Sequence, residues 1–550
     1  MTPLKRFKNL ILTDKQDIYQ ILLYALIAGL ISLSLPLGIQ SIINFIQAGK
    51  VSTSWIVLVV IVVVGVAFAG LLKIMQYRIT ENLQQKIFVR SSFEFAYRFP
   101  KIKFNEFNNQ YPPELANRFF DTLTIQKGFS KLLLEISGAA LQIIFGILLL
   151  SLYHSFFIFF GFILLVLLYL IFRINFNRGL ETSLKESKYK YKIAHWLQEI
   201  ARNHLSFKSN SIFNFSLNKS DSLVNEYLKQ RESHFQVLLR QFIQLTGFKI
   251  LITAGLLIIG GLLVINQQMN IGQFVAAEII ILSIVTAVEK LFSGLELFYD
   301  VLTSLEKLGT VVDMELEEDI KNSNYLVDKN NITIATENVS FNYPKSDKQI
   351  LKNINLSIQP KQHTLILGEN GSGKTTLIRL LARLIEPVSG NIFINNTNYK
   401  KFSSEEYRAK IGIITAQEMP FEGTILENIT CNNPEIKMSA VFDLLEKLKL
   451  TEAIKALPAG LDTIISSEGK QINSSTIQKI VLARSIINQP QLLFLENPLD
   501  KSDEQNCREI LDFLTEEKHP WTLVVVSKNN YWKQICKQIV HLEKGEIKSF

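Results

Sequence analysis

A glycine-rich stretch, GENGSGKTT at residues 368–376, has the residue types and the spacing needed to hold a triphosphate. Its glycines leave room for backbone N–H groups to approach phosphate oxygens, and a helix that follows presents its N-terminus to the same anion. We expect Lys374 to reach the β- and γ-phosphates and the Thr375 hydroxyl to ligate Mg²⁺. The residues predicted to surround the nucleotide phosphates are Gly368, Asn370, Gly371, Ser372, Gly373, Lys374, Thr375 and Thr376.

The elements around this stretch are those that a phosphate-binding loop requires. Strand-like sequence covers residues 332–343, 350–358 and 364–367, and the last of these strands leads directly into the loop. A helical pattern follows at residues 377–385, which completes the order strand, loop, helix. We therefore expect an α/β P-loop NTPase domain at residues 332–550, preceded by a polar, acidic linker at residues 313–331.

The N-terminal half has a different composition. The chain is 48% hydrophobic and only 20% charged, and its long apolar runs precede residue 300. A membrane helix needs ~20 predominantly apolar residues, and six segments meet this requirement. They are residues 19–45, 55–75, 132–152, 156–172, 248–265 and 274–292. Residues 1–312 are therefore predicted to form an all-α bundle of six transmembrane helices in a lipid bilayer.

Loop charges predict the orientation of this bundle, because Lys and Arg accumulate on the cytoplasmic side of membrane proteins. They are dense at the start of the chain and in the two long connections, after the second and the fourth segment. In the three short connections, Lys50 is the only Lys or Arg residue. We therefore expect a protein of the cytoplasmic membrane with both termini in the cytosol. This distribution also explains the formal net charge of +8, so we expect no nucleic-acid partner.

The two long connections are predicted to be helices that continue beyond the bilayer, reaching ~25–40 Å at 1.5 Å per residue. Residues 108–114 break the first connection near its middle, and residues 196–207 lie near the middle of the second. Two helical hairpins with cytosolic tips would be well placed to press on a cytosolic domain. Charged residues within membrane helices suggest a role in function, and the sixth segment contains Glu278, Glu289 and Lys290. Glu278 can instead reach the outer interface, and Glu289 can line a cavity, pair with Lys290 or lie near the inner interface.

Further motifs follow in a fixed order. Tyr343 lies in FNYP, Gln417 lies in IITAQE, and IGQFVA at residues 271–276 opens the last membrane helix. Together with ENI at 427–429, LPAGLDT at 457–463, VLARSI at 481–486 and LLFL at 492–495, they resemble the ABC transporter family over essentially the whole chain. The fusion of a membrane half to an ATP-binding half in this order resembles an exporter-type half-transporter. The resemblance implies that Tyr343 stacks on the adenine of ATP, and that Gln417 contacts Mg²⁺ and couples to the membrane helices.

The residues that perform hydrolysis in this family do not match. The signature, normally LSGGQ, falls on INSST at residues 472–476. Asn473 stands in place of the signature serine, and Ser474 and Ser475 stand in place of the two glycines. In the family this segment approaches the γ-phosphate bound by the opposite subunit, and a Cβ atom hinders such close approach. The acidic Walker B pair falls on Glu496 and Asn497. Glu496 keeps the charge expected near Mg²⁺, whereas Asn497 replaces the glutamate that polarises the attacking water.

The switch histidine of the family is also replaced, by Lys528. A lysine can contact phosphate as a point charge, but it lacks the acceptor nitrogen of a histidine. The aspartate of the D-loop is retained as Asp503. General-base assistance is worth about 10²–10⁴ in rate, and the neutral amide of Asn497 cannot supply it. We therefore expect this chain to bind Mg·ATP and to hydrolyse it weakly or not at all.

The resemblance further implies a dimer that holds two ATP molecules, each between the P-loop of one chain and the signature of the other. A homodimer of this chain would have two impaired sites, so a heterodimer with a catalytically competent half-transporter is favoured. Such a pair would export a substrate that the sequence does not identify. Two alternatives stay open: a hydrolysis-deficient membrane protein that is gated by ATP or acts as a regulatory scaffold, and a homodimeric exporter with slow turnover.

Overall fold

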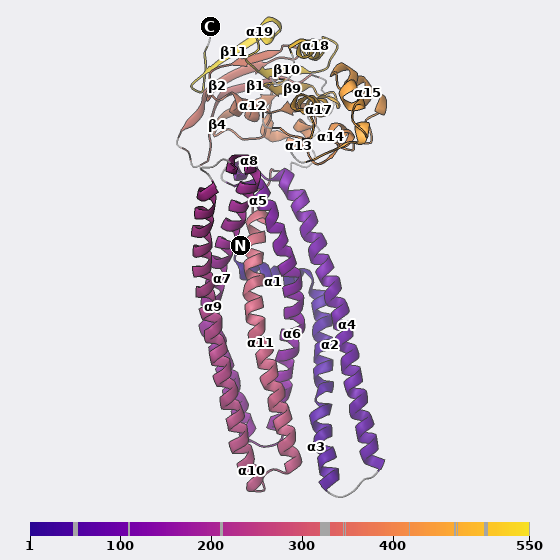
Figure 1. Cartoon of the computed structure of the whole chain (residues 1–550), viewed down its shortest axis with the longest axis vertical. Helices are drawn as coiled ribbons and strands as arrows, with labels where there is room; N and C mark the ends of the chain where they lie inside the picture. Colours follow the sequence, from indigo (N-terminus) through magenta and orange to yellow (C-terminus); the bar gives the residue numbers. More distant parts are fainter. Residues whose placement is uncertain are drawn as a thin grey trace. The chain divides into compact units, whose positions relative to one another are not determined.

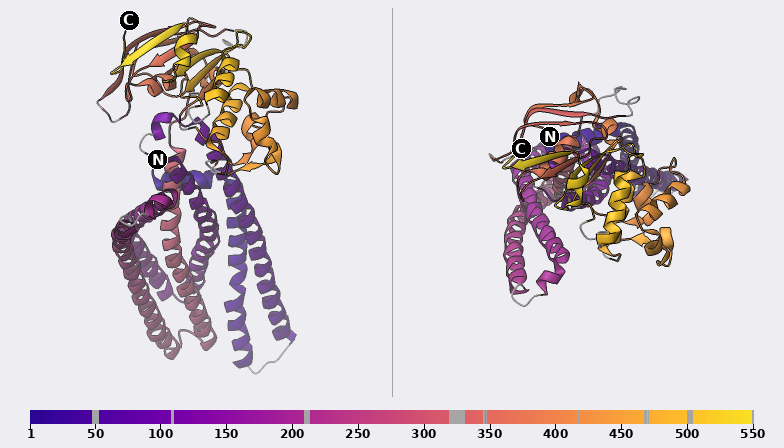
Figure 2. Two further views of the ribbon diagram at one scale, coloured as in Figure 1. Left: turned by 45° about the horizontal axis from the view of Figure 1, so that its top comes forward. Right: turned by 90° about the horizontal axis from the view of Figure 1, so that it is seen from above.

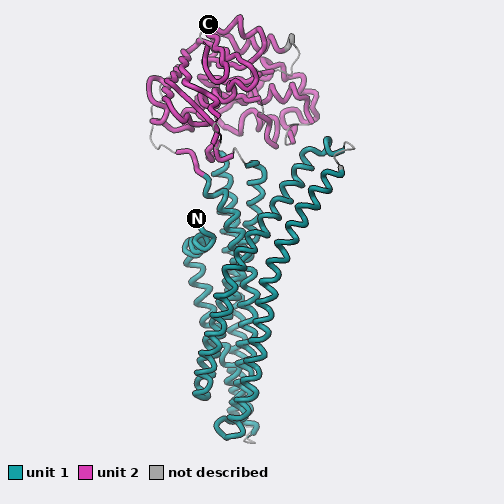
Figure 3. The backbone as a smooth tube through the Cα atoms, turned by 90° about the vertical axis from the view of Figure 1, so that its left-hand side faces the viewer, with its two compact units in different colours: residues 1–100, 110–314 teal, residues 101–109, 315–550 magenta. Residues whose placement is uncertain are grey.

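The computed structural model of the chain separates into two compact units, which Figure 3 shows in different colours. The first unit comprises residues 1–100 and 110–314, and the second comprises residues 101–109 and 315–550. The sequence-based ranges placed residues 101–109 with the membrane helices, whereas the structure groups them with the second unit. The residues that the structure describes are 1–47, 53–107, 110–208, 213–318, 331–344, 346, 348–416, 418–466, 469, 471–499 and 504–548.

Long helices make up the first unit. Among the described residues, six helical spans are long and apolar enough to cross a membrane, which confirms the six predicted segments. Several helices extend well beyond the apolar segments, as the long connections predicted, and α7 and α9 run side by side as a hairpin (Figure 2). The main helices are α1 (Pro3–Thr13), α2 (Lys15–Ser32), α3 (Ser34–Gln47), α4 (Thr53–Arg98), α6 (Asp121–Ser151), α7 (Phe156–Arg202), α9 (Phe213–Gly255) and α11 (Ile271–Val312).

Shorter helical elements lie between these helices. The first predicted segment is divided into α2 and α3, and Pro36 lies in the first turn of α3, where a proline is tolerated. The helix of the first long connection is interrupted between Arg98 and Pro112, and in the second connection α7 ends at Arg202. The remaining α-helices of this unit are α5 (Pro112–Asn117), α8 (His204–Phe207) and α10 (Gly261–Ile265).

Small residues let α6 and α11 pack closely in the first unit (Figure 1). A Cβ atom at Gly128 would lie 2.4 Å from Val301, and a Cβ atom at Gly146 would lie 2.8 Å from Ile284. Glycine at such positions lets helix backbones approach, which is a common packing mode between membrane helices. The result is a bundle in which α11 turns one apolar side towards its neighbours.

The second unit contains a six-stranded sheet, ordered β12-β11-β3-β10-β9-β6, and a four-stranded antiparallel sheet, ordered β2-β1-β4-β5. In the six-stranded sheet all neighbouring strands pair in parallel except β11 and β12, and helices pack around it, which confirms the predicted α/β class (Figure 1). The strands are β1 (Ile334–Asn342), β2 (Gln349–Ile358), β3 (Thr364–Leu367), β4 (Ser389–Ile394), β5 (Thr397–Asn398), β6 (Ile411–Ile414), β7 (Gly423–Thr424), β8 (Ile464–Ile465), β9 (Leu492–Glu496), β10 (Thr522–Val526), β11 (Gln538–Glu543) and β12 (Glu546–Lys548).

Strand order places three chain segments at one edge of this sheet. Strand β10 lies between β3 and β9, and all three run in the same direction. Every residue of β9 and β10 is buried, as is usual for strands that are covered on both faces. Because parallel strands end at the same edge, the segments that follow β3, β9 and β10 lie next to one another. The helices of this unit are α12 (Lys374–Leu381), α13 (Ser404–Arg408), α14 (Ile425–Thr430), α15 (Met438–Lys447), α16 (Thr451–Lys455), α17 (Ser474–Ile486), α18 (Glu504–Thr515) and α19 (Tyr531–Ile535).

Residues 101–107 are integrated into the second unit through backbone and side-chain contacts. Ile102 pairs antiparallel with Leu316, and the flanking N–H groups of residues 103 and 317 donate hydrogen bonds of 3.0 and 2.8 Å across this pairing. Phe104 packs against the buried core of the unit. Glu317 in turn accepts two hydrogen bonds, of 2.8 and 2.7 Å, from Arg408. These contacts explain why residues 101–107 group with the second unit.

Candidate nucleotide-binding site

The phosphate-binding loop connects β3 directly to α12, as the sequence predicted. Gly371 and Gly373 adopt φ angles of 82° and 104°, in the left-handed region that favours glycine. A Cβ atom at Gly368 would lie 2.2 Å from the backbone oxygen of Leu542, so this position also requires glycine. The loop therefore leaves its backbone open towards a cavity of about 360 Å³. Among the eight predicted loop residues, the cavity is lined by Gly368, Asn370, Gly371, Gly373, Lys374, Thr375 and Thr376.

Ser372 is the exception among the eight. Its side chain is buried, and its hydroxyl has no hydrogen-bond partner in the structure. A Cβ atom at Gly368 would lie 2.7 Å from this hydroxyl, so Ser372 packs beneath the loop. Its backbone N–H donates to the Glu369 oxygen at 3.2 Å, which is a turn within the loop. The structure therefore places the Ser372 side chain outside the cavity that the other seven residues line.

Lys374 spans the loop. Its ammonium donates hydrogen bonds to the backbone oxygens of Gly368 at 2.8 Å and Glu369 at 2.7 Å. Burial lowers the pKa of Lys374, and the nearby charge of Lys528 lowers it further. Two cations that repel each other around one cavity favour an anion between them, and a triphosphate supplies the charge that would relieve this repulsion. Lys374 is thus held in place to meet phosphate oxygens.

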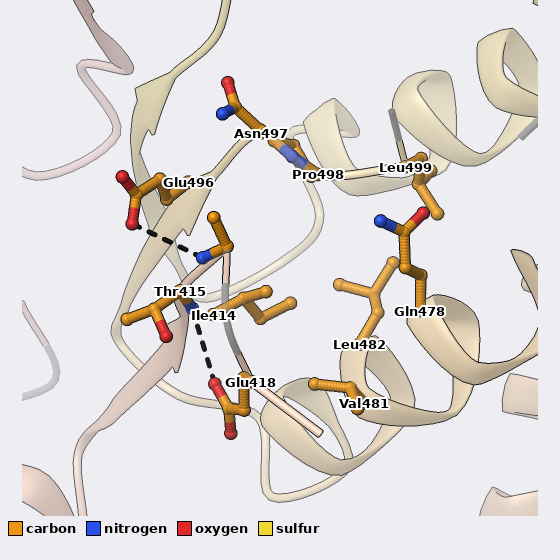
Figure 4. Close-up of a pocket in the computed structure, with 11 residues that line it drawn as sticks. Ile414, Thr415, Glu418, Gln478, Val481, Leu482, Glu496, Asn497, Pro498 and Leu499 are labelled. Carbon is orange, nitrogen blue, oxygen red and sulfur yellow. Dashed lines mark hydrogen bonds between the residues drawn. The ribbon is translucent and has the colours of Figure 1, made fainter. Parts of the chain in front are cut away.

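Glu496 and Thr375 form the part of the site that suits a metal ion. The Thr375 hydroxyl donates to one carboxylate oxygen of Glu496. The Ala416 N–H donates to the other oxygen at 3.3 Å, and Figure 4 draws this second bond. A hydroxyl and a carboxylate that converge in this way fit the oxygen ligands that Mg²⁺ prefers. Among the described residues, no group of three or more His, Cys, Asp or Glu side chains could hold a metal. Mg²⁺ here would therefore take most of its ligands from phosphates and water.

Tyr343 lies at the same cavity as the loop, at the end of β1. Its hydroxyl is 3.2 Å from the Thr376 hydroxyl and accepts a hydrogen bond of 3.4 Å from Arg379. Its ring meets Phe341 edge-on, with the ring centroids 5.0 Å apart. Tyr343 therefore has defined neighbours on both sides, and the strand-end turn brings this aromatic side chain to the predicted nucleotide position.

Asn497 and Lys528 follow β9 and β10, and both line the cavity. Asn497 adopts a φ of 48°, a left-handed conformation that asparagine tolerates better than most residues, and its N–H donates to the Val526 oxygen at 2.8 Å. In Figure 4 its amide points away from Glu418. Lys528 is exposed. The structure therefore places a neutral amide and an ammonium where the sequence predicted impaired catalytic positions.

The signature residues do not line this cavity. Asn473 caps α17, and its side-chain oxygen accepts a hydrogen bond of 2.8 Å from the Ser475 N–H. Asn473 and Ser474 are exposed at the start of that helix. The structure thus leaves the predicted signature at a separate surface of the same unit. Gln417 and Asp503 lie outside the described residues.

Comparison with known proteins identifies one domain of the chain and its overall fold. Residues 351–500, which include the loop, the signature and both Walker B positions, match the family model described as ABC transporter. The structure of a bacterial Atm1-family ABC exporter with ATP bound shares the fold with a TM-score of 0.83, at 17% identity, over 97% of this chain and 94% of that one. Residues 351–500 of this chain therefore form an ABC transporter domain. The family match implies that it binds ATP.

Curated relatives match this chain over part of their length. An uncharacterized ABC transporter ATP-binding protein, YfiB of Bacillus subtilis, is 31% identical over 44% of this chain and 42% of its own length. The alpha-hemolysin translocation ATP-binding protein HlyB of Escherichia coli O157:H7 is 26% identical over 52% of this chain and 40% of its own length. The matched stretches thus span less than half of either relative.

One carboxylate near the nucleotide-binding site was not predicted. Glu418 lies in a second small cavity beside Asn497 and Gln478, accepts a hydrogen bond of 3.0 Å from Arg484, and receives one of 3.4 Å from the Thr415 N–H (Figure 4). Burial raises the pKa of Glu418, and the charge of Arg484 opposes that rise. Its place directly after Gln417 is the sequence signal that could have identified it.

Proposed function

We propose that this chain is the ATP-binding half of an exporter in the cytoplasmic membrane and that it works with a catalytically competent partner half. One observation carries the proposal: six helices able to cross a membrane share a chain with a phosphate-binding loop whose Lys374 and Thr375 are already placed for a nucleotide. The fold shared with the Atm1-family exporter structure, and the similarity to HlyB, an alpha-hemolysin translocation ATP-binding protein, support transport as the purpose of ATP binding.

The orientation proposed for the chain follows from charge. Lys and Arg are dense at the start of the chain and in the long connections, and these segments are assigned to the cytosol with both termini. The ATP-binding half then lies where ATP is available. The opposite orientation would translocate the most basic connections, which the positive-inside rule disfavours.

The proposed cofactor set is ATP with Mg²⁺. Lys374 would hold the β- and γ-phosphates, while Thr375 and Glu496 would supply protein oxygens to the metal, together with Gln417 outside the described residues. Tyr343 would contact adenine. Glu496 is one methylene longer than the aspartate usual in the family, and its present contact with Thr375 shows that the longer side chain reaches the hydroxyl.

Weak hydrolysis by this chain alone follows from the groups at the far end of the cavity. Asn497 cannot accept a proton from water, and general-base assistance is worth about 10²–10⁴ in rate. Lys528 can bind phosphate but has no acceptor nitrogen. Ser474 and Ser475 add side chains at positions where the family has glycine. Asn497 and Lys528 would affect the site that contains this chain's own P-loop. Ser474 and Ser475 would affect the site that contains the P-loop of a partner.

In a heterodimer, one of the two composite ATP sites would keep a catalytic glutamate, whereas in a homodimer neither site would. One composite site would combine Lys374 and Thr375 with an intact partner signature, and it would hold ATP without a general base. The other would combine the partner's P-loop and glutamate with residues 473–476, and it would turn over at a reduced rate. In a homodimer, both sites would lack the base and the glycine signature. We therefore favour two different halves around an exported substrate.

The test is to purify the full chain alone and together with a co-expressed half-transporter from a neighbouring gene, and to measure ATP binding and phosphate release in both. We expect ATP binding in each preparation, but substantial phosphate release only from the pair. Lys374→Ala should remove binding by this chain, and Lys437→Ala, at an exposed position away from the loop, is the matched control. Brisk turnover by the chain alone would overturn the proposal, as would a pair that binds ATP but neither hydrolyses it nor transports.

A further inference from the structure

The Tyr343 hydroxyl is held by one side of α12, the helix that follows the phosphate-binding loop. It lies 3.2 Å from the Thr376 hydroxyl and accepts a hydrogen bond of 3.4 Å from Arg379. Thr376 and Arg379 are three positions apart, so they lie on the same side of the helix. Tyr343 is therefore held at its polar end, while the residue lines the nucleotide cavity.

Arg379 has a second aromatic neighbour, which comes from a distant part of the sequence. Its guanidinium carbon lies 4.9 Å from the centre of the Phe104 ring, within the ~6 Å typical of a cation–π contact. Phe104 belongs to residues 101–107, which are part of the second unit and pack against its core. Arg379 thus contacts two aromatic side chains, Phe104 and Tyr343.

The Arg379 guanidinium has no carboxylate partner in the described part of the chain. Arg408 of the same unit, by contrast, forms an ion pair of 2.7 Å with Glu317. A carboxylate usually fixes an arginine through charge-assisted hydrogen bonds. Arg379 is half-buried, and the contacts that orient it are those with the Phe104 ring and the Tyr343 hydroxyl. A change at Phe104 should therefore alter how Arg379 meets Tyr343.

We propose that Phe104 and Arg379 are positioning residues for Tyr343, and that they set the affinity of the site for the adenine base as distinct from the triphosphate. This inference rests on the proposed contact between Tyr343 and adenine, and it names the residues that hold Tyr343 ready for that contact. The phosphate-binding loop has anchors of its own, because Lys374 donates to two of its backbone oxygens. Base binding and phosphate binding should therefore respond separately to substitutions at Phe104 and Arg379.

The size of the effect follows from the contact that is being positioned. Stacking of a base on an aromatic ring contributes roughly five- to hundredfold in affinity, and it depends on the orientation of the ring. Tyr343→Ala removes the ring and sets the upper limit of the loss. Arg379→Met keeps a long side chain without the charge, and Phe104→Leu keeps an apolar side chain without a ring. Each of these two should lose part of the stacking contribution.

The test compares two ligands by isothermal titration of the full chain: Mg·ATP, and magnesium tripolyphosphate, which has the phosphates but no base. Arg379→Met and Phe104→Leu should each weaken ATP binding by about fivefold and change tripolyphosphate binding by less than about twofold. Phe104→Tyr keeps an aromatic ring and is the matched control, with both affinities unaltered. In a Tyr343→Ala background, Phe104→Leu should have no further effect on ATP affinity, because it acts through Tyr343.

Equal loss of both ligands would overturn the proposal, because Phe104 and Arg379 would then support the loop or act only through charge. An undiminished effect of Phe104→Leu in the Tyr343→Ala background would overturn it as well. If Tyr343→Ala weakens ATP binding and the other two variants do not, this inference alone fails. If Tyr343→Ala leaves ATP affinity unaltered, the adenine contact in the proposed function fails with it. Titration needs neither hydrolysis nor a partner chain, so the proposed transport is tested separately.

Discussion

The two ends of the nucleotide cavity differ in how well their side chains suit the chemistry of a nucleotide. At the end after β3, the residues suit phosphate binding. A glycine, Gly368, stands where the Leu542 oxygen leaves no room for a Cβ atom, and Lys374 donates hydrogen bonds to two backbone oxygens of the loop. At the end after β9 and β10, the backbone frame is equally regular, because the two strands pair over five residues. The side chains there, Asn497 and Lys528, are nevertheless unsuited to activating water.

This difference shows that the frame of the site and its chemistry are separable. The Asn497 N–H still bonds to the Val526 oxygen, so the strand end is held in position although its side chain cannot serve as a base. Glu496, one residue earlier, keeps two hydrogen bonds. The backbone frame that would hold a nucleotide therefore does not depend on the side chains that would hydrolyse it. The following predictions test whether binding and hydrolysis separate in this way.

The largest expected effect is at the loop. Lys374→Ala removes an ammonium that would face the phosphates, and losing one partner of such a charge pair corresponds to about 4 kcal/mol, or a ~10³-fold weaker affinity for ATP. Isothermal titration of the full chain with Mg·ATP measures the change, and Lys437→Ala should leave the affinity unaltered. An affinity for Mg·ATP within a few-fold of that of the original chain would contradict a role for Lys374 in holding the phosphates.

Restoring the other end should raise hydrolysis. In a chain that also carries Ser474→Gly and Ser475→Gly, Asn497→Glu is expected to increase phosphate release by about 10²-fold, because it returns a general base. The matched control is Asn497→Gln in the same background, which has similar size and no charge. Equal rates from the Glu and Gln variants would show that a missing base is not what limits this chain.

Two glycines of the loop should differ in their contribution to stability. Gly368→Ala forces a Cβ atom to within 2.2 Å of a backbone oxygen, whereas at Gly371 the added atom meets nothing within 4 Å. We expect about 2–3 kcal/mol of destabilisation for Gly368→Ala and about 1 kcal/mol for Gly371→Ala, which still has a positive φ. Thermal unfolding followed by tryptophan fluorescence measures both, and a larger shift for Gly371→Ala would refute this assignment.

The smallest expected effect concerns pH and Glu418. Because burial raises the pKa of this carboxyl in the folded state, the folded chain binds its proton more tightly than the unfolded chain does. The stability that depends on Glu418 should therefore fall as the pH rises from the unfolded pKa through the folded one. Denaturant unfolding between about pH 4 and 6 tests this, since Glu418→Gln should remove that part of the pH dependence. An unchanged profile would count against it.

Most of the architecture could be predicted from the sequence, for physical reasons. Apolar runs of membrane length and the strand–loop–helix order of residues 364–385 are local signals, and both elements formed as expected. The role of Ser372 could not be predicted, because its burial depends on how the loop folds over it. The ion pair between Lys249 and Glu289 joins residues 40 positions apart on two helices. Such contacts follow from packing, which spacing alone does not reveal.

The integration of residues 101–107 into the second unit has a consequence for the design of recombinant fragments. A recombinant fragment that starts at residue 332 would lack Phe104, whose ring packs against the core, and Glu317, the partner of Arg408. That fragment would expose apolar surface that the full chain covers and leave a half-buried guanidinium without its carboxylate. The ATP-binding unit is therefore discontinuous in sequence, and its complete form requires residues encoded more than 200 codons upstream of that start.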